Sequence, residues 1–252
     1  MGSGHRIAII ADIHANVWAL DAVLSDIRRE RVEVVVNLGD VLYGPLAPRA
    51  TFERLQGEKV VLTVRGNQDR QIYDANAKDR SSNPTLNFVI EDSGEEAVHW
   101  LEGLPETAVF EGEVFLCHGT PYSDETYLLE DVMSGRPFLK SEEEIVRLVG
   151  DVRHPVILCG HSHIPRLVRL ASGQIILNPG SVGLPAYSDD EPIPHSMETY
   201  SPHASYAILT RTAAGWDVAF QRVAYDFEKA SQAAAARGRK DWAKGIATGR
   251  VT

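Results

Sequence analysis

Cysteine and basic residues are both scarce in this chain of 252 residues. Its two cysteines, Cys117 and Cys159, are too few for a fold held together by disulfides. We expect them to be buried thiols in a reducing cytosol, with a single disulfide between them as the alternative. Acidic residues outnumber basic ones by 35 to 25, which gives a formal net charge of −10. A general nucleic-acid binder needs a basic surface, so we expect no stable binding of nucleic acid.

Long apolar runs are missing as well. No run approaches the roughly 20 residues of a membrane span, so we expect no association with a membrane. Residues 1–5 are too short and too polar for a secretory signal, and the expected compartment is the cytoplasm. With 44% hydrophobic residues the chain can bury a substantial core. A single domain spanning residues 1–252 is the simplest expectation.

Apolar runs and helical periodicity alternate at the start of the chain. Residues 6–11 are an apolar run typical of a strand that is covered on both faces, and residues 32–38 predict a second buried strand. Between them Asn16 can cap a helix in which Leu20 and Leu24 recur at helical spacing. This order of strand, helix and strand predicts a parallel pair, with the chemistry on loops beyond the carboxyl ends of the strands.

The rest of the chain continues as short strands and helices. Strands are predicted at residues 60–64, 114–117, 156–159, 167–170, 174–177, 205–210 and 217–223. Helices are predicted at residues 48–55, after the capping boxes Ser93/Glu96 and Ser141/Glu144, and at residues 226–242. Residues 70–92 and the proline-rich residues 184–204 are predicted to be long loops. A lid or substrate contact, a subunit interface and a solvated loop are the alternatives for both stretches.

Five polar clusters stand directly after predicted strands. They read Asp12-Ile13-His14, Gly39-Asp40, Gly66-Asn67-Gln68-Asp69, Cys117-His118-Gly119 and Gly160-His161-Ser162-His163. Any one of them has an ordinary structural explanation, such as a solvated aspartate beside a packed histidine. Together they supply seven candidate ligands, namely Asp12, His14, Asp40, Asn67, His118, His161 and His163. Seven ligands are enough for two metal ions, and such ions about 3.5–4 Å apart are the usual apparatus for hydrolysing phosphate esters.

The donor types narrow the choice of metal. Carboxylate and amide oxygens with imidazole nitrogens, and no obvious thiolate, suit Mn²⁺, Fe, Zn²⁺ or Ni²⁺ better than Ca²⁺. We expect two divalent ions, with Mn²⁺ as the first choice. The carboxylate of Asp40 has two oxygens and can bridge two cations, which no histidine can do. Bound divalent ions would also reverse the local field, so the acidic composition is compatible with a small phosphorylated substrate.

The order D-x-H, GD, GN, H and GH-x-H resembles the calcineurin-like metallophosphoesterase superfamily over most of the chain. Residues 39–45, 178–183 and 204–207 are similar to its small prokaryotic phosphodiesterase-like branch. The resemblance implies an α/β fold, a four-layer α/β/β/α sandwich of two mixed sheets with a dimetal site at the strand ends. It also implies a division of the ligands: Asp12, His14 and His163 for one metal, and Asn67, His118 and His161 for the other, with Asp40 between them.

The implied activity is hydrolysis of a small phosphorylated substrate, most simply as a phosphodiesterase. A water or hydroxide that bridges two metals has a lowered pKa and is the implied nucleophile. Asp40 and Asn67 are therefore the candidate catalytic residues. A phosphomonoesterase or protein phosphatase is the alternative within the enzymes, and a non-catalytic metal-binding scaffold or interaction protein is the alternative outside them. No heptad or apolar patch predicts an oligomeric state.

One cluster departs from the pattern of the family. Many members carry a histidine directly after the asparagine of GN, where it is thought to protonate or stabilise the leaving oxygen. This chain has Gln68, which donates hydrogen bonds but transfers no proton at neutral pH. Alongside Gln68, we consider Arg65, Tyr43 and His203 as candidate substrate contacts, and His195 as a weaker one. Asp69 is expected to orient a ligand rather than to bind metal.

Overall fold

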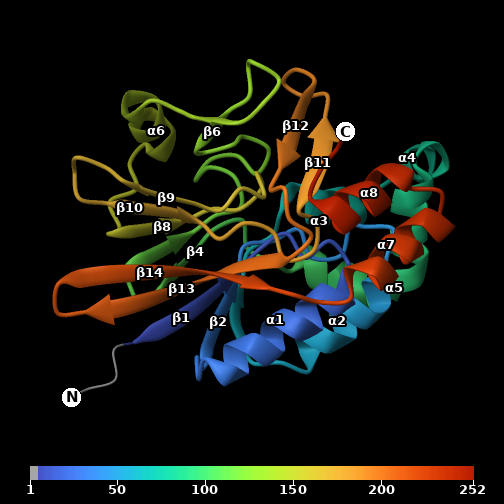
Figure 1. The fold of residues 1–252 in the computed structure, drawn as a ribbon, viewed down its shortest axis with the longest axis horizontal. Coiled ribbons are helices and arrows are strands. Elements are labelled where there is room, and N and C mark those ends of the chain that lie inside the picture. Colours follow the sequence, from blue (N-terminus) through green and yellow to red (C-terminus); the bar gives the residue numbers. More distant parts are fainter. Residues whose placement is uncertain (1–4) are drawn as a thin grey trace.

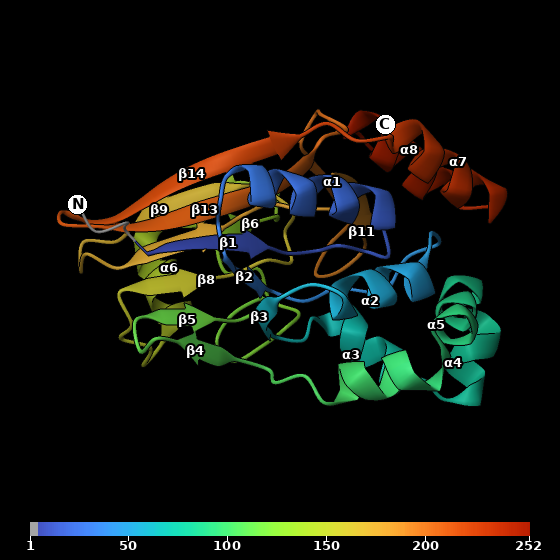
Figure 2. The same ribbon diagram turned by 90° about the horizontal axis from the view of Figure 1, so that it is seen from below.

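Two five-stranded sheets form the centre of this computed structural model, which describes residues 5–252 (Figures 1 and 2). The first sheet has the order β14 (Gly215–Val223), β13 (Ala204–Thr212), β1 (Arg6–Ile10), β2 (Val34–Asn37), β3 (Val60–Thr63). The second has the order β4 (Ala108–Phe110), β5 (Val114–Leu116), β8 (Val156–Leu158), β10 (Ile175–Asn178), β9 (Arg166–Arg169). Residues 1–4, on which the argument against a secretory signal partly rests, lie outside the described residues.

Both sheets are mixed, as predicted. β1 pairs in parallel with β2, and β2 with β3, whereas β13 pairs with β1 in antiparallel fashion. In the second sheet β5, β8 and β10 are parallel, with the antiparallel strands β4 and β9 at the edges. Each predicted strand is found within two residues of its expected bounds. The parallel strands place their carboxyl ends, and therefore the polar clusters, at one edge of the sheets.

The core divides into layers because successive side chains of a strand point to opposite faces. Ile7 and Ile9 of β1 lie between the two sheets, packed in one apolar cluster with residues of β5 and β8. Ala8 and Ile10 face the other way and belong to a cluster with α1 (Val17–Arg29) and α2 (Pro48–Gln56). On the outer face of the second sheet lies α6 (Glu142–Val149), which buries Ile145. The predicted four-layer sandwich is therefore confirmed.

Two predicted helix starts are found as expected. The side chain of Asn16 accepts a hydrogen bond from the backbone N–H of Ala19, 3.1 Å away, and caps α1. Ser141 accepts from the N–H of Glu144 at 3.2 Å and caps α6. Each cap satisfies a backbone donor that the first turn of a helix leaves without a partner.

The prediction of a loop over residues 70–92 is wrong. The segment holds most of α3 (Asn67–Tyr73), all of α4 (Ala77–Ser82) and the first half of α5 (Pro84–Glu102). Asn76 and Asn83 cap α4 and α5. α3 and α4 were missed because they are short and bury few residues: α4 buries none, so its sequence shows no apolar periodicity.

Three further predictions need correction. The box Ser93/Glu96 is not formed, because Ser93 Oγ lacks a hydrogen-bond partner in the described structure. A helical segment does begin there: Gly94, whose φ is +75°, breaks α5 into two segments, and the second starts directly after it. Residues 226–242 form parts of two helices, α7 (Phe227–Ala236) and α8 (Lys240–Thr248), separated at Gly238 with φ +79°. Residues 184–204 contain the hairpin of β11 (Ala186–Asp189) and β12 (His195–Glu198), so the stretch is partly regular.

The remaining strands, β6 (Glu130–Asp131) and β7 (Phe138–Leu139), form a small hairpin of their own. Cys117 and Cys159 are both buried free thiols. None of the helices between residues 5 and 252 combines the length and the apolar character needed to cross a bilayer.

Candidate dimetal centre

The five polar clusters meet at one edge of the two sheets. The side chains of Asp12, His14 and His163 form one group whose potential ligand atoms lie within 4.8 Å of one another. Asp40, His118 and His161 form a second group with the same spread. All six residues are buried, and they come from loops that follow β1, β2, β5 and β8. These are the groupings that the family resemblance implied, with Asp40 in the second group.

Asp40 and Asn67 connect the two groups. One carboxylate oxygen of Asp40, Oδ2, lies 3.5 Å from His118 Nε2 and 3.9 Å from His14 Nε2, so it faces both groups. Asn67, the first residue of α3, places its Oδ1 3.1 Å from the same His118 nitrogen. The structure thus gathers all seven candidate ligands around one centre, with Asp40 facing both groups.

Each of the four histidines points one ring nitrogen into the centre and uses the other to hold its orientation. The outer nitrogens lie against backbone carbonyls: His14 Nδ1 on Tyr43 (3.0 Å), His118 Nδ1 on Leu38 (2.7 Å), His163 Nδ1 on Leu184 (2.6 Å) and His161 Nε2 on Glu125 (3.1 Å). A carbonyl only accepts, so the outer nitrogen carries the proton in every ring. In a neutral ring the inner nitrogen then has a free lone pair that points into the centre. This is the arrangement typical of histidines that bind a metal.

The geometry of the first group fits a cation. His14 Nε2 and His163 Nε2 lie only 3.0 Å apart although the ring protons sit on the opposite nitrogens. Two lone pairs at this distance repel each other unless a positive charge lies between them. Asp12 Oδ2 is also buried and has no hydrogen-bond partner in the described residues. A buried carboxylate oxygen without a partner is costly, and a bound divalent ion would remove the cost.

Backbone strain marks the same residues. Five of the ligands have positive φ values: 54° at Asp12, 50° at His14, 53° at Asp40, 67° at His161 and 58° at His163. Residues other than glycine pay on the order of 1–3 kcal/mol each for such conformations, and these cluster at functional sites. Interlocking loops hold them in place, because the N–H of His14 donates to the carbonyl of Asp40 at 3.0 Å.

Asp69 lies behind the ligands and organises two of the loops. Its Oδ2 accepts from the N–H groups of Asp40 (2.8 Å) and Gly66 (2.9 Å), and its Oδ1 accepts from Val41 (2.8 Å). The side chain is fully buried. It therefore fixes the bridging carboxylate and the start of α3 relative to each other without entering the centre, as expected for a residue that orients a ligand.

The charges of the buried groups depend on one another. Burial lowers the pKa of His14 and of His161 to about 4, so both rings are neutral at pH 7. Burial also opposes a charge on His118, but the adjacent Asp40 carboxylate outweighs it and raises the pKa of His118 to about 10. Burial disfavours the charge on Asp40 as well, yet His118 holds its pKa well below the usual range. His118 and Asp40 thus form an ion pair in the metal-free protein.

We expect metal binding to release a proton from His118. A ligand nitrogen needs its lone pair, so between pH 7 and 9 the imidazolium must give up its proton when a metal enters. The apparent metal affinity should then rise with pH, by about tenfold per unit for one proton. Calorimetric titration with Mn²⁺ in two buffers of different ionisation enthalpy measures the release directly. Equal heats in both buffers would contradict it.

The candidate substrate contacts are placed unequally. Tyr43 and Gln68 line a cavity of about 230 Å³ together with metal ligands of both groups. Arg65 forms an ion pair with Glu106 at 2.6 Å and lines a separate cavity of about 260 Å³ that reaches His118. His203 lies outside the walls of these cavities; its N–H donates to Ser201 Oγ at 3.3 Å. His195 is buried, with its Nε2 3.0 Å from the hydroxyl of Tyr127.

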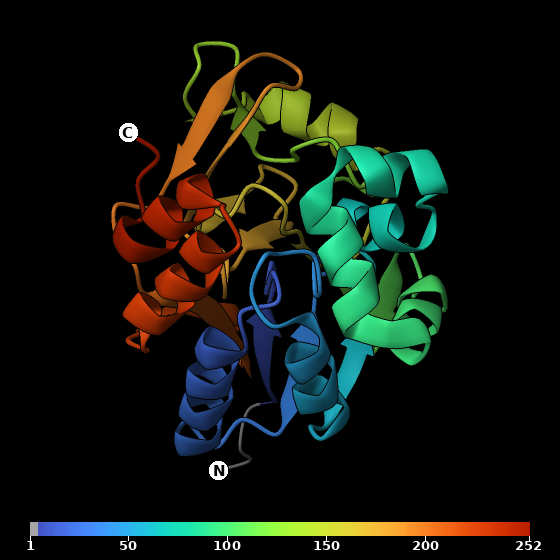
Figure 3. The same cartoon turned by 90° about the vertical axis from the view of Figure 1, so that its right-hand side faces the viewer.

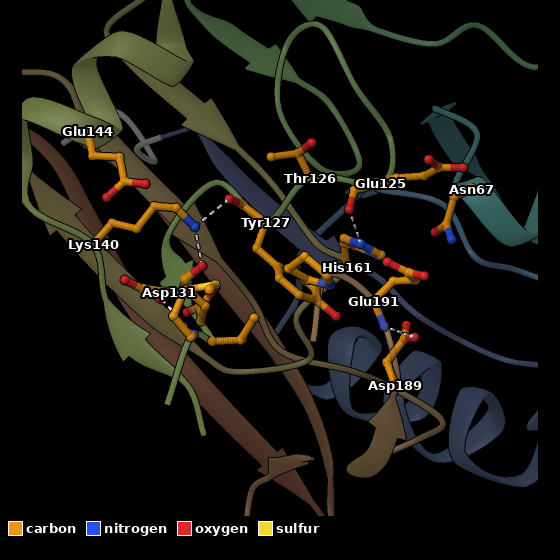
Figure 4. A pocket seen from close by; sticks show the side chains of 14 residues that line it. Asn67, Glu125, Thr126, Tyr127, Asp131, Lys140, Glu144, His161, Asp189 and Glu191 are labelled. Atoms are coloured by element: carbon orange, nitrogen blue, oxygen red, sulfur yellow. Dashed lines mark hydrogen bonds between the residues drawn. The ribbon is translucent and has the colours of Figure 1, made fainter. Parts of the chain in front are cut away.

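A third cavity, of about 710 Å³, opens beside the centre (Figure 4). Asn67 and His161 belong to its wall and also to the wall of the 230 Å³ cavity. In Figure 4 the ring of Tyr127 lies against that of His161, and their centroids are 4.6 Å apart. Tyr187 of β11 donates its hydroxyl proton to the carbonyl of His161 at 3.0 Å. Through Tyr187, the segment of residues 184–204 therefore supports the candidate ligand His161.

Four residues near the centre escaped the sequence analysis. Tyr127 and Tyr187 support His161 as described, and Arg239 and Trp242 of the C-terminal helices line the 230 Å³ cavity. None of them follows a strand or belongs to a polar cluster. Their place depends on packing between distant parts of the chain, and no local pattern signals it.

Buried carboxylates and imidazoles at the strand ends of a two-sheet sandwich define the class of dimetal phosphoesterases. The chain belongs to the calcineurin-like phosphoesterase superfamily, because the sequence model of that superfamily's domain matches residues 6–200. Metal-dependent hydrolysis of phosphoesters is the chemistry that this membership supports. The family typically uses a dimetal site, and the two groups of ligands described above correspond to it.

Two relatives extend over nearly the whole chain. An uncharacterised protein of Methanocaldococcus jannaschii is 26% identical over 258 residues, which cover 94% of each chain. The crystal structure of a metallophosphoesterase from Sphaerobacter thermophilus is similar with a TM-score of 0.75 and 24% identity. The match covers 98% of this chain and 100% of the other. At this level of identity the likeness establishes a shared fold.

Proposed function

We propose that this protein is a dimetal-dependent phosphodiesterase that hydrolyses a small phosphorylated substrate. The observation that carries the proposal is the pair of buried ligand groups joined by Asp40. A scaffold protein gains nothing from five strained ligand residues and a buried carboxylate oxygen without a partner, whereas a catalytic centre does. The complete ligand set therefore favours catalysis over a role in assembly alone.

Asp12, His14 and His163 would hold one ion, and Asn67, His118 and His161 the other, with Asp40 shared. When bound, two divalent ions lower the pKa of a coordinated water and offset the negative charge that develops on the phosphoryl oxygens. Burial raises the pKa of the Cys117 and Cys159 thiols, so both stay protonated at neutral pH and provide no thiolate ligand. The oxygen and nitrogen donors suit Mn²⁺ first, with Fe, Zn²⁺ and Ni²⁺ as alternatives.

Gln68 contacts Asp40 and lines the cavity in which the phosphoryl group would bind. Asp40 is held by its Oδ1, which accepts from the N–H of Gln68 at 2.9 Å. The Gln68 side chain lines the 230 Å³ cavity, where its amide offers hydrogen-bond donors but no titratable proton. A leaving group that needs protonation is therefore served poorly at this position, which favours esters with good leaving groups.

The cavities support a diester over a monoester. Asn67 and His161 belong to the walls of the 710 Å³ and the 230 Å³ cavity. A phosphoryl group beside these two residues has room for one substituent in each cavity, as a diester requires. The larger cavity is lined by six carboxylate side chains and one lysine, Lys140, which disfavours polyanions such as nucleic acids.

Hydrolysis of two chromogenic substrates tests the proposal. Purified protein is loaded with Mn²⁺ and assayed with bis-p-nitrophenyl phosphate and with p-nitrophenyl phosphate, beside the Asp40→Asn variant. We expect faster cleavage of the diester. Faster cleavage of the monoester would make the protein a phosphomonoesterase, and no turnover of either substrate above the variant with any first-row metal would favour the scaffold.

The variant Gln68→His should change substrate preference without changing metal content. An imidazole at this position can protonate a leaving oxygen, so cleavage of esters with poor leaving groups should rise by roughly 10²-fold, the lower end for general acid catalysis. Esters of p-nitrophenol, a good leaving group, should gain much less. The comparison of p-nitrophenyl with alkyl esters measures this difference. Equal changes for both would rule out a leaving-group role for position 68.

A further inference from the structure

The C-terminal helix pair lies beyond the part of the chain that the family model matches. That match ends at residue 200, whereas α7 and α8 span residues 227–248. Figure 3 shows the pair on one side of the loops that follow β1 and β2, opposite α3, α4 and α5. Through Arg239 and Trp242 the pair contributes to the wall of the 230 Å³ cavity that contains the metal ligands. Residues outside the matched domain therefore line the same cavity as the candidate ligands.

The helix pair is fixed firmly against the centre. Trp242 is buried, and its ring meets that of His14 edge to face with centroids 5.5 Å apart. Gly245 lies so close to the carbonyl of Ala186 in β11 that a Cβ would not fit there. The guanidinium of Arg239, just before α8, lies over the Trp242 ring at 5.4 Å. Arg239 is thus presented to the cavity by a rigid support rather than by a mobile tail.

The hydrogen bonds of Arg239 leave donors for a ligand. Its Nε and Nη2 donate to the carboxylate of Asp241 at 2.9 and 2.6 Å, and its Nη1 donates to Thr85 Oγ1 at 2.9 Å. A guanidinium has five N–H groups, so one on each terminal nitrogen has no partner among the described residues. The side chain is 31% exposed. It is fixed by two neighbours yet still open to the cavity.

The charge and the size of the 230 Å³ cavity indicate which ligand the free N–H groups of Arg239 bind. Arg239 is the one cationic side chain among the residues that line the 230 Å³ cavity, which also contains Asp40 and Asp189. A cavity of this volume has room for a phosphoryl group and a few further atoms. Arginine suits phosphate because its planar fork matches two oxygens at once.

We propose that Arg239 binds a non-bridging oxygen of the phosphoryl group that is hydrolysed. This inference rests on the proposed function and deepens it. The C-terminal helix pair then serves as the element that holds the reacting group against the dimetal centre. Arginine keeps its proton, so Arg239 stabilises charge and supplies no acid for the leaving group.

Binding of inorganic phosphate to the Mn²⁺-loaded full chain tests the assignment without turnover. Arg239→Ala should raise the Kd for phosphate, measured by calorimetry, by roughly 10- to 100-fold, the value of a hydrogen bond to a charged group. Its Mn²⁺ content should equal that of the unmodified protein. Arg237→Ala is the matched control: it removes the same charge from the same turn, where Arg237 stacks over Phe88 at 4.1 Å away from the cavity. It should leave the Kd unchanged.

A second variant distinguishes phosphate binding by Arg239 from a purely structural role of Arg239 at the start of α8. Asp241→Ala removes the partner of Arg239 but keeps the guanidinium, so phosphate should bind as tightly as before or more tightly. A loss in Asp241→Ala as large as in Arg239→Ala would overturn the proposal, because it would assign Arg239 a structural role. Unchanged phosphate binding in Arg239→Ala would overturn it as well. If the unmodified protein binds phosphate through Arg239 yet hydrolyses neither ester, the proposed function fails and the binding assignment stands.

A series of aryl phosphodiesters adds a kinetic criterion. If Arg239 contacts a non-bridging oxygen, Arg239→Ala should lower kcat/KM by a similar factor for every leaving group. A loss that grows steadily with the pKa of the leaving group would place Arg239 at the leaving oxygen and overturn the assignment.

Discussion

Replacement of Asp40 by asparagine is expected to lower kcat for bis-p-nitrophenyl phosphate by roughly 10³-fold or more. This is at least the loss in kcat seen when an enzyme loses one principal contact to the transition state. Asp40 Oδ2 faces His118 at 3.5 Å and His14 at 3.9 Å, so its negative charge serves both ligand groups. Asparagine keeps the shape and still accepts from the Gln68 N–H but offers no charge for two cations. Steady-state kinetics with metal analysis of the purified variant measures both effects.

Asp189→Asn is the matched control for this experiment. Asp189 lines the 230 Å³ cavity together with Asp40 but belongs to neither ligand group. Its replacement by asparagine removes one negative charge near the centre. Because Asp189 is not a candidate metal ligand, kcat should change by less than about tenfold. Equal losses in the two variants would mean that general electrostatics, rather than bridging by Asp40, explains the result.

Replacement of Gly66 by alanine is expected to abolish metal binding and to destabilise the fold. A Cβ on Gly66 would overlap the Asp40 carboxylate and its backbone nitrogen. The φ of Gly66 is −94°, which alanine adopts easily, so the effect is purely steric. Asp40 must move, and the three N–H bonds to Asp69 move with it. We expect a loss of about 1–3 kcal/mol in the free energy of unfolding, as in other overpacked cores.

Gly57→Ala provides the comparison. Gly57 ends α2 with φ −78°, and a Cβ there would meet its nearest neighbours at an ordinary 3.5 Å. The change should leave metal content unaltered and stabilise the protein by about 0.4–1 kcal/mol through the unfolded state. Thermal unfolding and metal analysis of both variants distinguish the two cases. Normal metal content in Gly66→Ala would contradict the close fit of the β2 and β3 loops.

The ligands could be predicted from the sequence because the signals are local. A continuous apolar run predicts a buried strand, and the polar residues directly after it must lie at the sheet edge. Asp12 and His14 follow β1, and His161 and His163 follow β8. Parallel neighbours then place these ends side by side. The fold followed from the same reasoning together with the family resemblance.

The surroundings of the centre could not be predicted in this way. α3 and α4 carry too little buried surface to show a period, so residues 70–92 read as a loop. Trp242 packs on His14 across 228 positions of sequence, a contact set by the way α8 lies on β11. Nothing near Arg239 in the sequence places it in a cavity with Asp40. Such contacts depend on packing between distant parts of the chain, and local sequence patterns such as apolar periodicity and helix caps do not predict them.

Stepwise addition of Mn²⁺ to the metal-free protein tests the central claim most directly. Hydrolysis of bis-p-nitrophenyl phosphate is followed at each ratio of metal to chain. If the two ligand groups share Asp40 in one dimetal centre, turnover should appear mainly with the second equivalent and reach its plateau at two ions per chain. Full activity at one ion per chain, or no activity at any ratio with any first-row metal, would contradict this account.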